Sequence, residues 1–174
     1  LKAPMETVKE EIITIRESRK THKKAPKFTP AGQTSQMIVG ASNETDLQVI
    51  QLSSHFYKQY DLKRVYYSGY VPMLSDSRLP AIGTPVPMIR ENRLYQADWL
   101  MRFYGFGAHE IVEPDSPFLD LDCDPKLAWA IRHREHFPVN IQTATYEMIV
   151  RIPGIGTKTA KKIVKARKFN QLTL

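Results

Sequence analysis

The tetrapeptide Pro153-Gly-Ile-Gly156 constrains the local fold more than any other feature of this chain. A proline at its first position cannot continue a helix, because the ring removes a backbone donor and clashes with the preceding turn. The two glycines permit a tight reversal with no side chain over the backbone. The sequence therefore predicts a helical hairpin, in which one short helix ends before the turn and a second begins just after it.

The residues on both sides of the turn fit two amphipathic helices. A hydroxyl of Thr143 or Thr145 is suited to cap the first helix by accepting a hydrogen bond from an orphan backbone N–H. The second helix begins with N–H groups that lack helical partners, and the positive end of its dipole lies behind them. This arrangement is a ready site for a phosphate. The predicted apolar positions are Met148, Ile149 and Ile152 before the turn, and Ala160, Ile163 and Val164 after it.

Basic charge is concentrated at this end of the chain. The segment 151–174 holds seven basic residues and no acidic one, whereas the whole chain has 25 Lys and Arg against 18 Asp and Glu. Residues 1–150 are therefore formally neutral, and the net charge of +7 is a local feature. Positive charge clustered on one element is the electrostatic pattern typical of a nucleic-acid contact. The seven residues are Arg151, Lys158, Lys161, Lys162, Lys165, Arg167 and Lys168.

Residues 139–168 resemble the helix-hairpin-helix DNA-binding motif. The matching parts are an Asn-Ile-x-Thr-Ala lead-in at 140–144, the glycine hairpin, and Ala160, Ile163 and Arg167 after it. In that family the hairpin amides hold a DNA backbone phosphate without reading base sequence. The resemblance implies that the amides come from Gly154, Ile155 and Gly156, and the charges from Lys158, Lys161, Lys162 and Lys165. The alternatives are a helical hairpin with a solvated basic face and a surface for protein contacts.

The body of the chain carries a β-α-β pattern. Residues 36–40 form a short apolar run that ends in glycine, residues 46–60 fit an amphipathic helix, and residues 64–71 form a second β-rich run. This order predicts a parallel strand pair with a right-handed crossover. Ligands of such folds bind at the carboxyl ends of the strands, which here lie at 40–43 and 68–73.

Other segments of the body are expected to be structural. Residues 4–24 fit a helix, and residues 74–90 form a proline-containing loop that is long enough to be functional. A helix over 90–106 is dense in aromatic side chains, which at this spacing belong to the core; stacking on a nucleobase is the alternative interpretation. The aromatic residues are Tyr95, Trp99, Phe103 and Tyr104.

No metal site is predicted. The acidic run from Asp120 to Asp124 lacks the glycine and glutamate of a calcium loop, so Asp124 is better explained as an N-cap with Pro125 at the first helical position. His133 and His136 lie one turn apart, without an obvious third ligand.

No apolar run is long enough to cross a membrane and no signal peptide is visible. The single cysteine fits a reducing cytosol, so a cytoplasmic location is expected.

Several sequence segments in the body of the chain resemble a family of DNA modification/repair radical SAM proteins. They are residues 31–40, 64–68, 93–106 and 120–130, in that order, and the resemblance covers roughly residues 1–170. Members of this family end in a helix-hairpin-helix segment and are often linked to a uracil-DNA glycosylase-like partner. The resemblance implies an α/β fold in which residues 1–138 are the last part of a (β/α) barrel and 139–174 the DNA-binding module.

The cysteine count departs from this family. Radical SAM enzymes hold a [4Fe–4S] cluster with three cysteines in a Cys-x3-Cys-x2-Cys loop, whereas this chain has only Cys123. The cluster and S-adenosylmethionine are therefore expected in an intact, longer protein whose loop lies N-terminal to these residues. A weak match to the adenine-binding strand of such barrels implies S-adenosylmethionine contacts from Ile38, Gly40 and Ser42. The catalytic residues stay unassigned.

Three hypotheses follow from the sequence. The first is part of a radical SAM enzyme that acts on DNA, with a chain that is inactive alone. The second is a non-catalytic scaffold that brings a partner enzyme to DNA, and the third is a protein-interaction domain with no role on DNA. Neither a Ser-His-Asp triad nor a Cys-His pair nor paired carboxylates stand out in the sequence.

Overall fold

The structure is a computed structural model that describes residues 2–169 and 171. The chain divides into two compact units. The first comprises Leu1–Asn43 and Gln51–Val86, and the second comprises Glu44–Ile50 and Pro87–Leu174. The sequence-based boundary between residues 138 and 139 stays a prediction.

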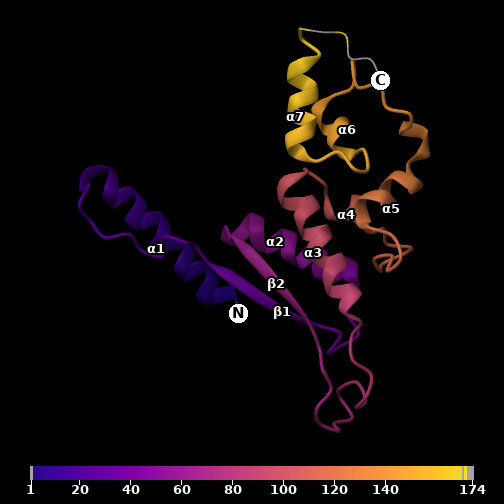
Figure 1. The fold of residues 1–174 in the computed structure, drawn as a ribbon. Coiled ribbons are helices and arrows are strands. Elements are labelled where there is room, and N and C mark those ends of the chain that lie inside the picture. The colour runs from indigo at the N-terminus through magenta and orange to yellow at the C-terminus, as the bar shows by residue number, and fades with distance from the viewer. Residues whose placement is uncertain (1, 170, 172–174) are drawn as a thin grey trace. The chain divides into compact units, whose positions relative to one another are not determined.

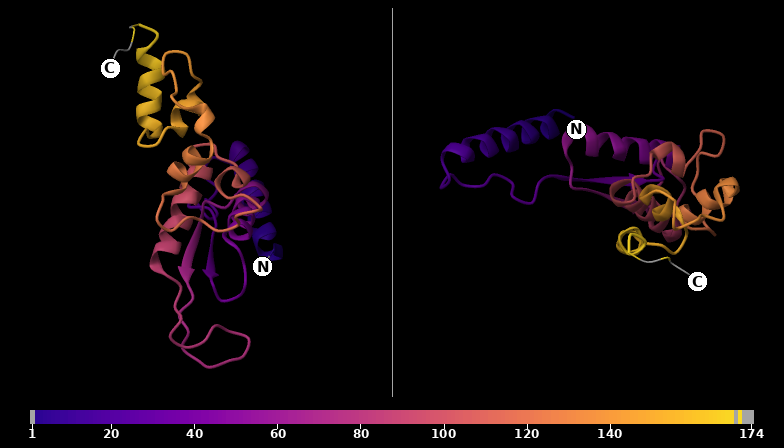
Figure 2. Two further views of the ribbon diagram at one scale, coloured as in Figure 1. Left: turned by 90° about the vertical axis from the view of Figure 1, so that its right-hand side faces the viewer. Right: turned by 90° about the horizontal axis from the view of Figure 1, so that it is seen from above.

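The first unit is built on the predicted β-α-β segment. Strand β1 (Thr34–Val39) pairs in parallel with β2 (Arg64–Gly69), and α2 (Asp46–Tyr60) connects them along the chain. The register runs from Thr34 opposite Arg64 to Val39 opposite Gly69, so both strands end at the same edge (Figure 1; Figure 2). Helix α1 (Lys2–Thr21), close to the predicted 4–24, precedes the sheet and has no buried residue.

One face of this sheet is packed and the other is open. Val39, Val65 and Tyr67 are at most 2% exposed, whereas Ile38 is 60% and Tyr66 42% exposed. The alternation follows from the two-residue period of a strand. The Tyr67 hydroxyl donates to the Ser53 hydroxyl of α2 over 2.8 Å and so ties the helix to the packed face.

The partial barrel expected from the sequence is not evident in the described residues. They form a mixed α/β fold with one sheet of two parallel strands. After β2 the chain enters a proline-containing loop instead of a crossover helix that leads to a third strand, and the named elements that follow are helical. A two-stranded sheet cannot close on itself, so the observed part is a single β-α-β unit.

The second unit is helical apart from an isolated bridge. It contains α3 (Met88–Phe103), α4 (Ala108–Ile111), α5 (Pro125–Arg132), a 3-10 turn η1 (Arg134–His136), α6 (Tyr146–Arg151) and α7 (Thr157–Ala166). Asp46 is 1% exposed and joins distant parts of this unit: its carboxylate accepts from Arg90 Nε over 2.7 Å and from the Leu119 amide over 2.9 Å.

The acidic run before α5 is structural, as predicted for Asp124. The Asp124 side chain accepts from the amides of Lys126 and Leu127, and Pro125 occupies the first turn of α5. Asp120 accepts from the amides of Asp122 and Cys123. Such local side-chain acceptors satisfy backbone donors in turns and helix starts.

The prediction that the aromatic residues of α3 belong to the core is wrong for two of them. The buried face of α3 consists of smaller side chains, which include Leu94 and Leu100. Trp99 and Phe103 are 55% and 46% exposed, with ring centroids 4.5 Å apart. Leucines at helical spacing fill the face that packs, so the outer pair belongs to the surface.

No helix among residues 2–169 combines the length and hydrophobicity that crossing a membrane requires.

Candidate nucleic-acid interface

The hairpin forms as the sequence predicts. The Thr145 hydroxyl accepts from the Met148 amide and caps α6, which ends at Arg151, two residues before Pro153. Gly154 follows with φ of +81°, a conformation that side chains disfavour. A Cβ placed on Gly154 would meet no atom within 4 Å, so this corner of the turn faces open space. Helices α6 and α7 lie side by side (Figure 1).

A small core fixes the two helices. Ile149, Val150 and Ala160 are fully buried, and Ile163 and Val164 pack against them. All three apolar positions expected after the turn therefore belong to this core. Of those expected before it, Ile149 does, whereas Met148 and Ile152 are not part of it and the buried Val150 was not predicted. The alanine at 160 lets the helices approach closely, because a larger side chain there would separate α6 from α7. The packing holds the turn in one conformation from inside.

The start of α7 presents backbone donors at the mouth of the turn. Gly156 is the N-cap, and no side chain caps this helix start. The Gly156 carbonyl accepts from the Ala160 amide over 2.9 Å, which is the first turn of the helix. The Ile155 amide donates to the Ile152 carbonyl over 3.1 Å, so this predicted phosphate donor is already used inside the turn. An anion at this mouth would thus rely on Gly156 and the first turn of α7.

The four predicted lysines share the outer side of α7. Lys158, Lys161, Lys162 and Lys165 are all exposed, whereas Ala160 between them is buried. Their spacing of three, four and seven residues places them along one side of a helix. We call these four residues the lysine stripe. It extends from the glycine turn along α7 and supplies charge beside the uncapped helix start.

Arg151 belongs to the scaffold and not to the exposed charges. Its Nη2 lies 2.7 Å from Glu110 Oε1, and its guanidinium lies 4.6 Å from the ring centroid of Phe106 and 5.6 Å from that of Trp129. Burial acts to raise the pKa of Glu110, but the hydrogen bond from the Gly107 amide and the Arg151 charge outweigh it and leave the pKa lowered. The pair fixes the end of α6 against α4.

Arg167 is also used internally. Its guanidinium donates to the carbonyls of Ile141 and Ala144 over 3.0 and 2.5 Å, which fastens the end of α7 to the segment before α6. The sequence count of seven basic residues therefore overstates the charge available to a ligand. Two arginines are structural, and the lysine stripe and Lys168 remain exposed.

Lys126 is a functional candidate that the sequence analysis missed. It is 8% exposed, and its Nζ donates to the Ile155 carbonyl of the hairpin over 2.5 Å. The same Nζ lies 5.0 Å from the ring centroid of Tyr104. Burial lowers the pKa of Lys126 to about 8, although the Asp124 charge opposes this shift. A lysine in the first turn of a short helix has no sequence signal that separates it from a solvated one.

The predicted S-adenosylmethionine contacts lie together at the end of β1. Ile38 is in the strand, Gly40 follows it with φ of +77°, and Ser42 is exposed. Nothing in the first unit tests their role. Cys123, half-buried, is the one thiol of the chain and does not fit a three-cysteine cluster. Burial and the charges of Asp120 and Asp124 raise its pKa, which disfavours the thiolate that a metal needs.

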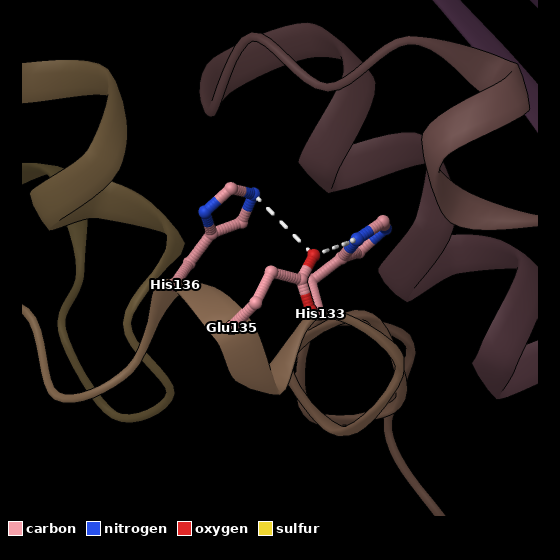
Figure 3. Close-up of side chains that lie close together, drawn as sticks. All are labelled: His133, Glu135 and His136. Atoms are coloured by element: carbon pink, nitrogen blue, oxygen red, sulfur yellow. Dashed lines mark hydrogen bonds and ion pairs between the residues drawn. The ribbon is translucent and has the colours of Figure 1, made fainter.

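One cluster has the residue types of a metal site. Figure 3 shows that the Glu135 carboxylate faces both His133 and His136, and the sequence analysis missed Glu135 as their third member. Glu135 Oε1 lies 3.2 Å from His133 Nδ1 and 3.7 Å from His136 Nε2. The pKa of Glu135 is lowered, first by its own backbone amide and also by the two histidines. Surface contacts between carboxylates and imidazoles have the same residue types and distances without a metal, so we assign no cofactor to them.

Comparison with known proteins supports the hairpin assignment. Residues 135–172 match the helix-hairpin-helix motif. The chain is 31% identical over 108 residues to the Holliday junction branch migration complex subunit RuvA of Stutzerimonas stutzeri, and 30% identical over the same length to RuvA proteins of Pseudomonas aeruginosa and Pseudomonas entomophila. The first alignment covers 60% of this chain and 53% of that relative, so the chain spans about half the length of the curated relatives it matches. No solved structure matches the chain significantly.

Proposed function

We propose that this chain binds the phosphate backbone of DNA, without base specificity, through the hairpin at residues 139–169. The observation that carries the proposal is the uncapped start of α7 at an open glycine turn, flanked by the lysine stripe. Backbone amides and a helix dipole bind one phosphate, and the lysines approach its neighbours. The motif match at 135–172 and the similarity to RuvA, whose name refers to a DNA junction, support the same class of ligand.

The expected salt dependence follows from the number of phosphates contacted. If three to five phosphates are neutralised, the logarithm of the association constant falls with the logarithm of the salt concentration at a slope of about −3 to −4.5. Arg151 and Arg167 are bound within the fold, so they do not add to the number of phosphates that the hairpin can neutralise. A slope near zero would contradict electrostatic binding.

The test is binding of the full chain to a short labelled duplex of random sequence, followed by fluorescence anisotropy. Lys158→Glu/Lys161→Glu reverses two charges beside the turn, and Lys23→Glu/Lys24→Glu reverses two charges after α1 as a matched control of net charge. We expect the first variant to lose binding at least tenfold more than the second. Equal losses would mean that net charge, and not the hairpin, attracts DNA.

A finer proposal concerns the intact protein. We propose that these residues are the C-terminal part of a radical SAM-type DNA modification or repair protein, in which the hairpin holds DNA near chemistry supplied by other residues. The sequence segments that resemble this family, at 31–40, 64–68, 93–106 and 120–130, support it. Since the chain holds one cysteine, we derive no chemical step from it. A gene whose upstream sequence lacks a Cys-x3-Cys-x2-Cys loop would contradict this proposal.

Two further parts of this proposal concern ligands of the intact protein. Ile38, Gly40 and Ser42 would contact S-adenosylmethionine at the end of β1, and calorimetric titration of the intact protein beside Gly40→Val would test this. A uracil-DNA glycosylase-like protein would be a partner, which co-purification with the intact protein would test. Neither part is needed for DNA binding by the hairpin.

A second candidate function is that of a non-catalytic DNA-binding subunit. It is favoured by the similarity to RuvA, which is named as a subunit of a complex. On this hypothesis the chain positions a partner enzyme on DNA. Turnover of DNA by the intact protein alone, measured by mass spectrometry of its nucleosides, would contradict it.

A further inference from the structure

A groove lies beside the hairpin, between α3 and the start of α5. Its volume is about 320 Å³, and it is open to solvent on one side. Trp99 and Leu100 line it from α3, Tyr104 follows them, and Pro125 and Lys126 line it from α5. All of these residues and the hairpin belong to the second unit of the chain.

Two residues of the groove also contact the hairpin. Lys126 donates to the Ile155 carbonyl over 2.5 Å. The Tyr104 hydroxyl lies 3.5 Å from the position that a Cβ would take on Gly156, so this hydroxyl borders the turn at its second glycine. The groove therefore borders the hairpin that carries the proposed phosphate site.

We propose that this groove binds an unpaired nucleobase of the strand whose phosphate the hairpin holds. The inference rests on the proposed function, because the lysine stripe and the uncapped start of α7 bring the strand to this place. A base of the same strand is then the flat, largely apolar ligand nearest to the groove. Bases inside a duplex are stacked on their neighbours, so the occupant is a base that is single-stranded or turned out of the helix.

Trp99 is the side chain suited to stack on such a base. It is 55% exposed, although tryptophan is among the largest apolar side chains, while the other tryptophan of the chain, Trp129, is 4% exposed in the core. Phe103 contacts the indole, with ring centroids 4.5 Å apart and ring planes at 53°. Aromatic side chains that bind single strands stack on bases of any sequence, which suits a hairpin that does not read sequence.

Polar groups at the rim complement the edges of a base. Gln96 lines the groove; its Oε1 accepts from Arg93 Nη1 over 2.9 Å, and its side-chain amide also carries two N–H donors. Lys126 supplies a cation on the hairpin side, held by the Ile155 carbonyl and the ring of Tyr104. Asp124, which also lines the groove, is engaged as the N-cap of α5.

The experiment uses intrinsic tryptophan fluorescence of the full chain. Single-stranded oligothymidylate is titrated at low salt beside an oligonucleotide of equal length made of abasic sites, which keeps the phosphates and removes the bases. We expect oligothymidylate to quench the exposed Trp99 and to bind roughly 5- to 100-fold more tightly than the abasic strand. Equal affinity and equal quenching by the two strands would overturn the proposal.

Two variants separate the groove from the hairpin. Trp99→Ala should remove the preference for bases while the affinity for the abasic strand stays within about twofold, and Trp99→Phe should restore part of the preference. Lys158→Glu/Lys161→Glu should weaken both strands alike. Loss of binding to every strand by the unmodified chain would contradict the hairpin proposal; retained binding without a preference for bases contradicts the groove alone. The emission of Trp129 reports that each variant is folded.

Discussion

The hairpin and the parallel sheet both place a glycine of positive φ shortly after the end of an element, but they differ in what surrounds it. Gly154 follows α6 with φ of +81°, and Gly40 follows β1 with φ of +77°. Beside Gly154 stand an uncapped helix start and the lysine stripe, all within 12 residues of sequence. Beside Gly40 stands the end of one neighbouring strand. The proposed phosphate site is thus formed by residues close in sequence, whereas a site at a sheet edge needs strands that are distant in sequence.

The difference extends to packing. The hairpin buries Ile149, Val150 and Ala160 completely between two helices. The sheet leaves Ile38 and Tyr66 exposed on one face, although parallel sheets are normally covered on both faces. The hairpin can therefore be tested as it stands in this chain.

The largest effect is expected from Gly154→Glu. It places a charged side chain in a positive-φ conformation at the mouth of the phosphate site, which combines backbone strain of about 1 kcal/mol with direct repulsion of the phosphate. We expect at least a 30-fold loss of duplex affinity by anisotropy. The matched control is Gly83→Glu, since Gly83 has φ of +89° in the long loop and equally open surroundings. Equal losses of affinity in the two variants would contradict the hairpin as the phosphate site.

Lys126→Met should lower the affinity for duplex by about three- to tenfold at pH 7, because it removes a cation that lies against the turn. In the unmodified chain the affinity should fall as the pH rises through about 8, where Lys126 loses its proton. The variant should show no such fall. An identical pH profile in the two proteins would show that the charge of Lys126 does not act on DNA.

The same lysine predicts the pH dependence of stability. Its pKa is lowered to about 8 from an ordinary value of 10.5, so the unfolded chain holds this proton more tightly than the folded one. The free energy of unfolding is therefore highest above pH 10.5, where Lys126 is neutral in both states. It falls as the pH decreases to about 8, because the folded chain must then bury the charged ammonium. Urea unfolding followed by circular dichroism should show this rise between pH 8 and 10.5 and its absence in Lys126→Met. A fall in stability over this window that the variant shares would contradict the assignment.

A smaller effect is expected from Glu110→Gln. It removes the charge that holds Arg151 at the end of α6 and should cost about 1 kcal/mol in the free energy of unfolding at pH 7. Because the pKa of Glu110 is lowered, this contribution is present above its ordinary pKa of 4.5 and is lost as the pH falls below it. The difference between the two proteins in urea unfolding should therefore shrink in acid. A difference that is constant from pH 7 to pH 3 would assign the effect to packing alone.

The smallest effect is expected from Ile38→Thr in the sheet. The side chain is 60% exposed and threonine keeps the β-branch, so the free energy of unfolding of this chain should change by less than about 0.5 kcal/mol. The same substitution in a longer protein that covers this face should cost clearly more. A large loss in the present chain would mean that the open face is already packed in solution.

The sequence predicted the hairpin closely because its determinants are local. Pro153 and the glycines fix the turn, Thr145 and Asp124 cap helices as expected, and the apolar positions of α6 and α7 meet. These features depend on backbone sterics and on hydrogen bonds between residues a few positions apart.

The sequence was less informative where distant residues decide. Trp99 was expected in the core, but the opposite face of α3 is the one that packs. Lys126 could not be linked to Ile155, since 29 residues separate them. Glu135 gave no signal as a neighbour of both histidines until the η1 turn placed them on one side. The expected barrel depended on strands that the described residues do not contain. Helical periodicity reveals an apolar face but does not show which surface covers it.

Around the hairpin, arginines stabilise the fold and lysines are exposed to a ligand. Fold stability and the proposed DNA affinity therefore depend on different residues. Arg151 and Arg167 hold the fold through an ion pair and through bonds to carbonyls, while the four lysines of the stripe are exposed. If the proposed function holds, mutation or acetylation of single lysines of the stripe should shorten the residence time on DNA at a nearly constant melting temperature. A graded series of such variants would set the dissociation rate from a strand in steps.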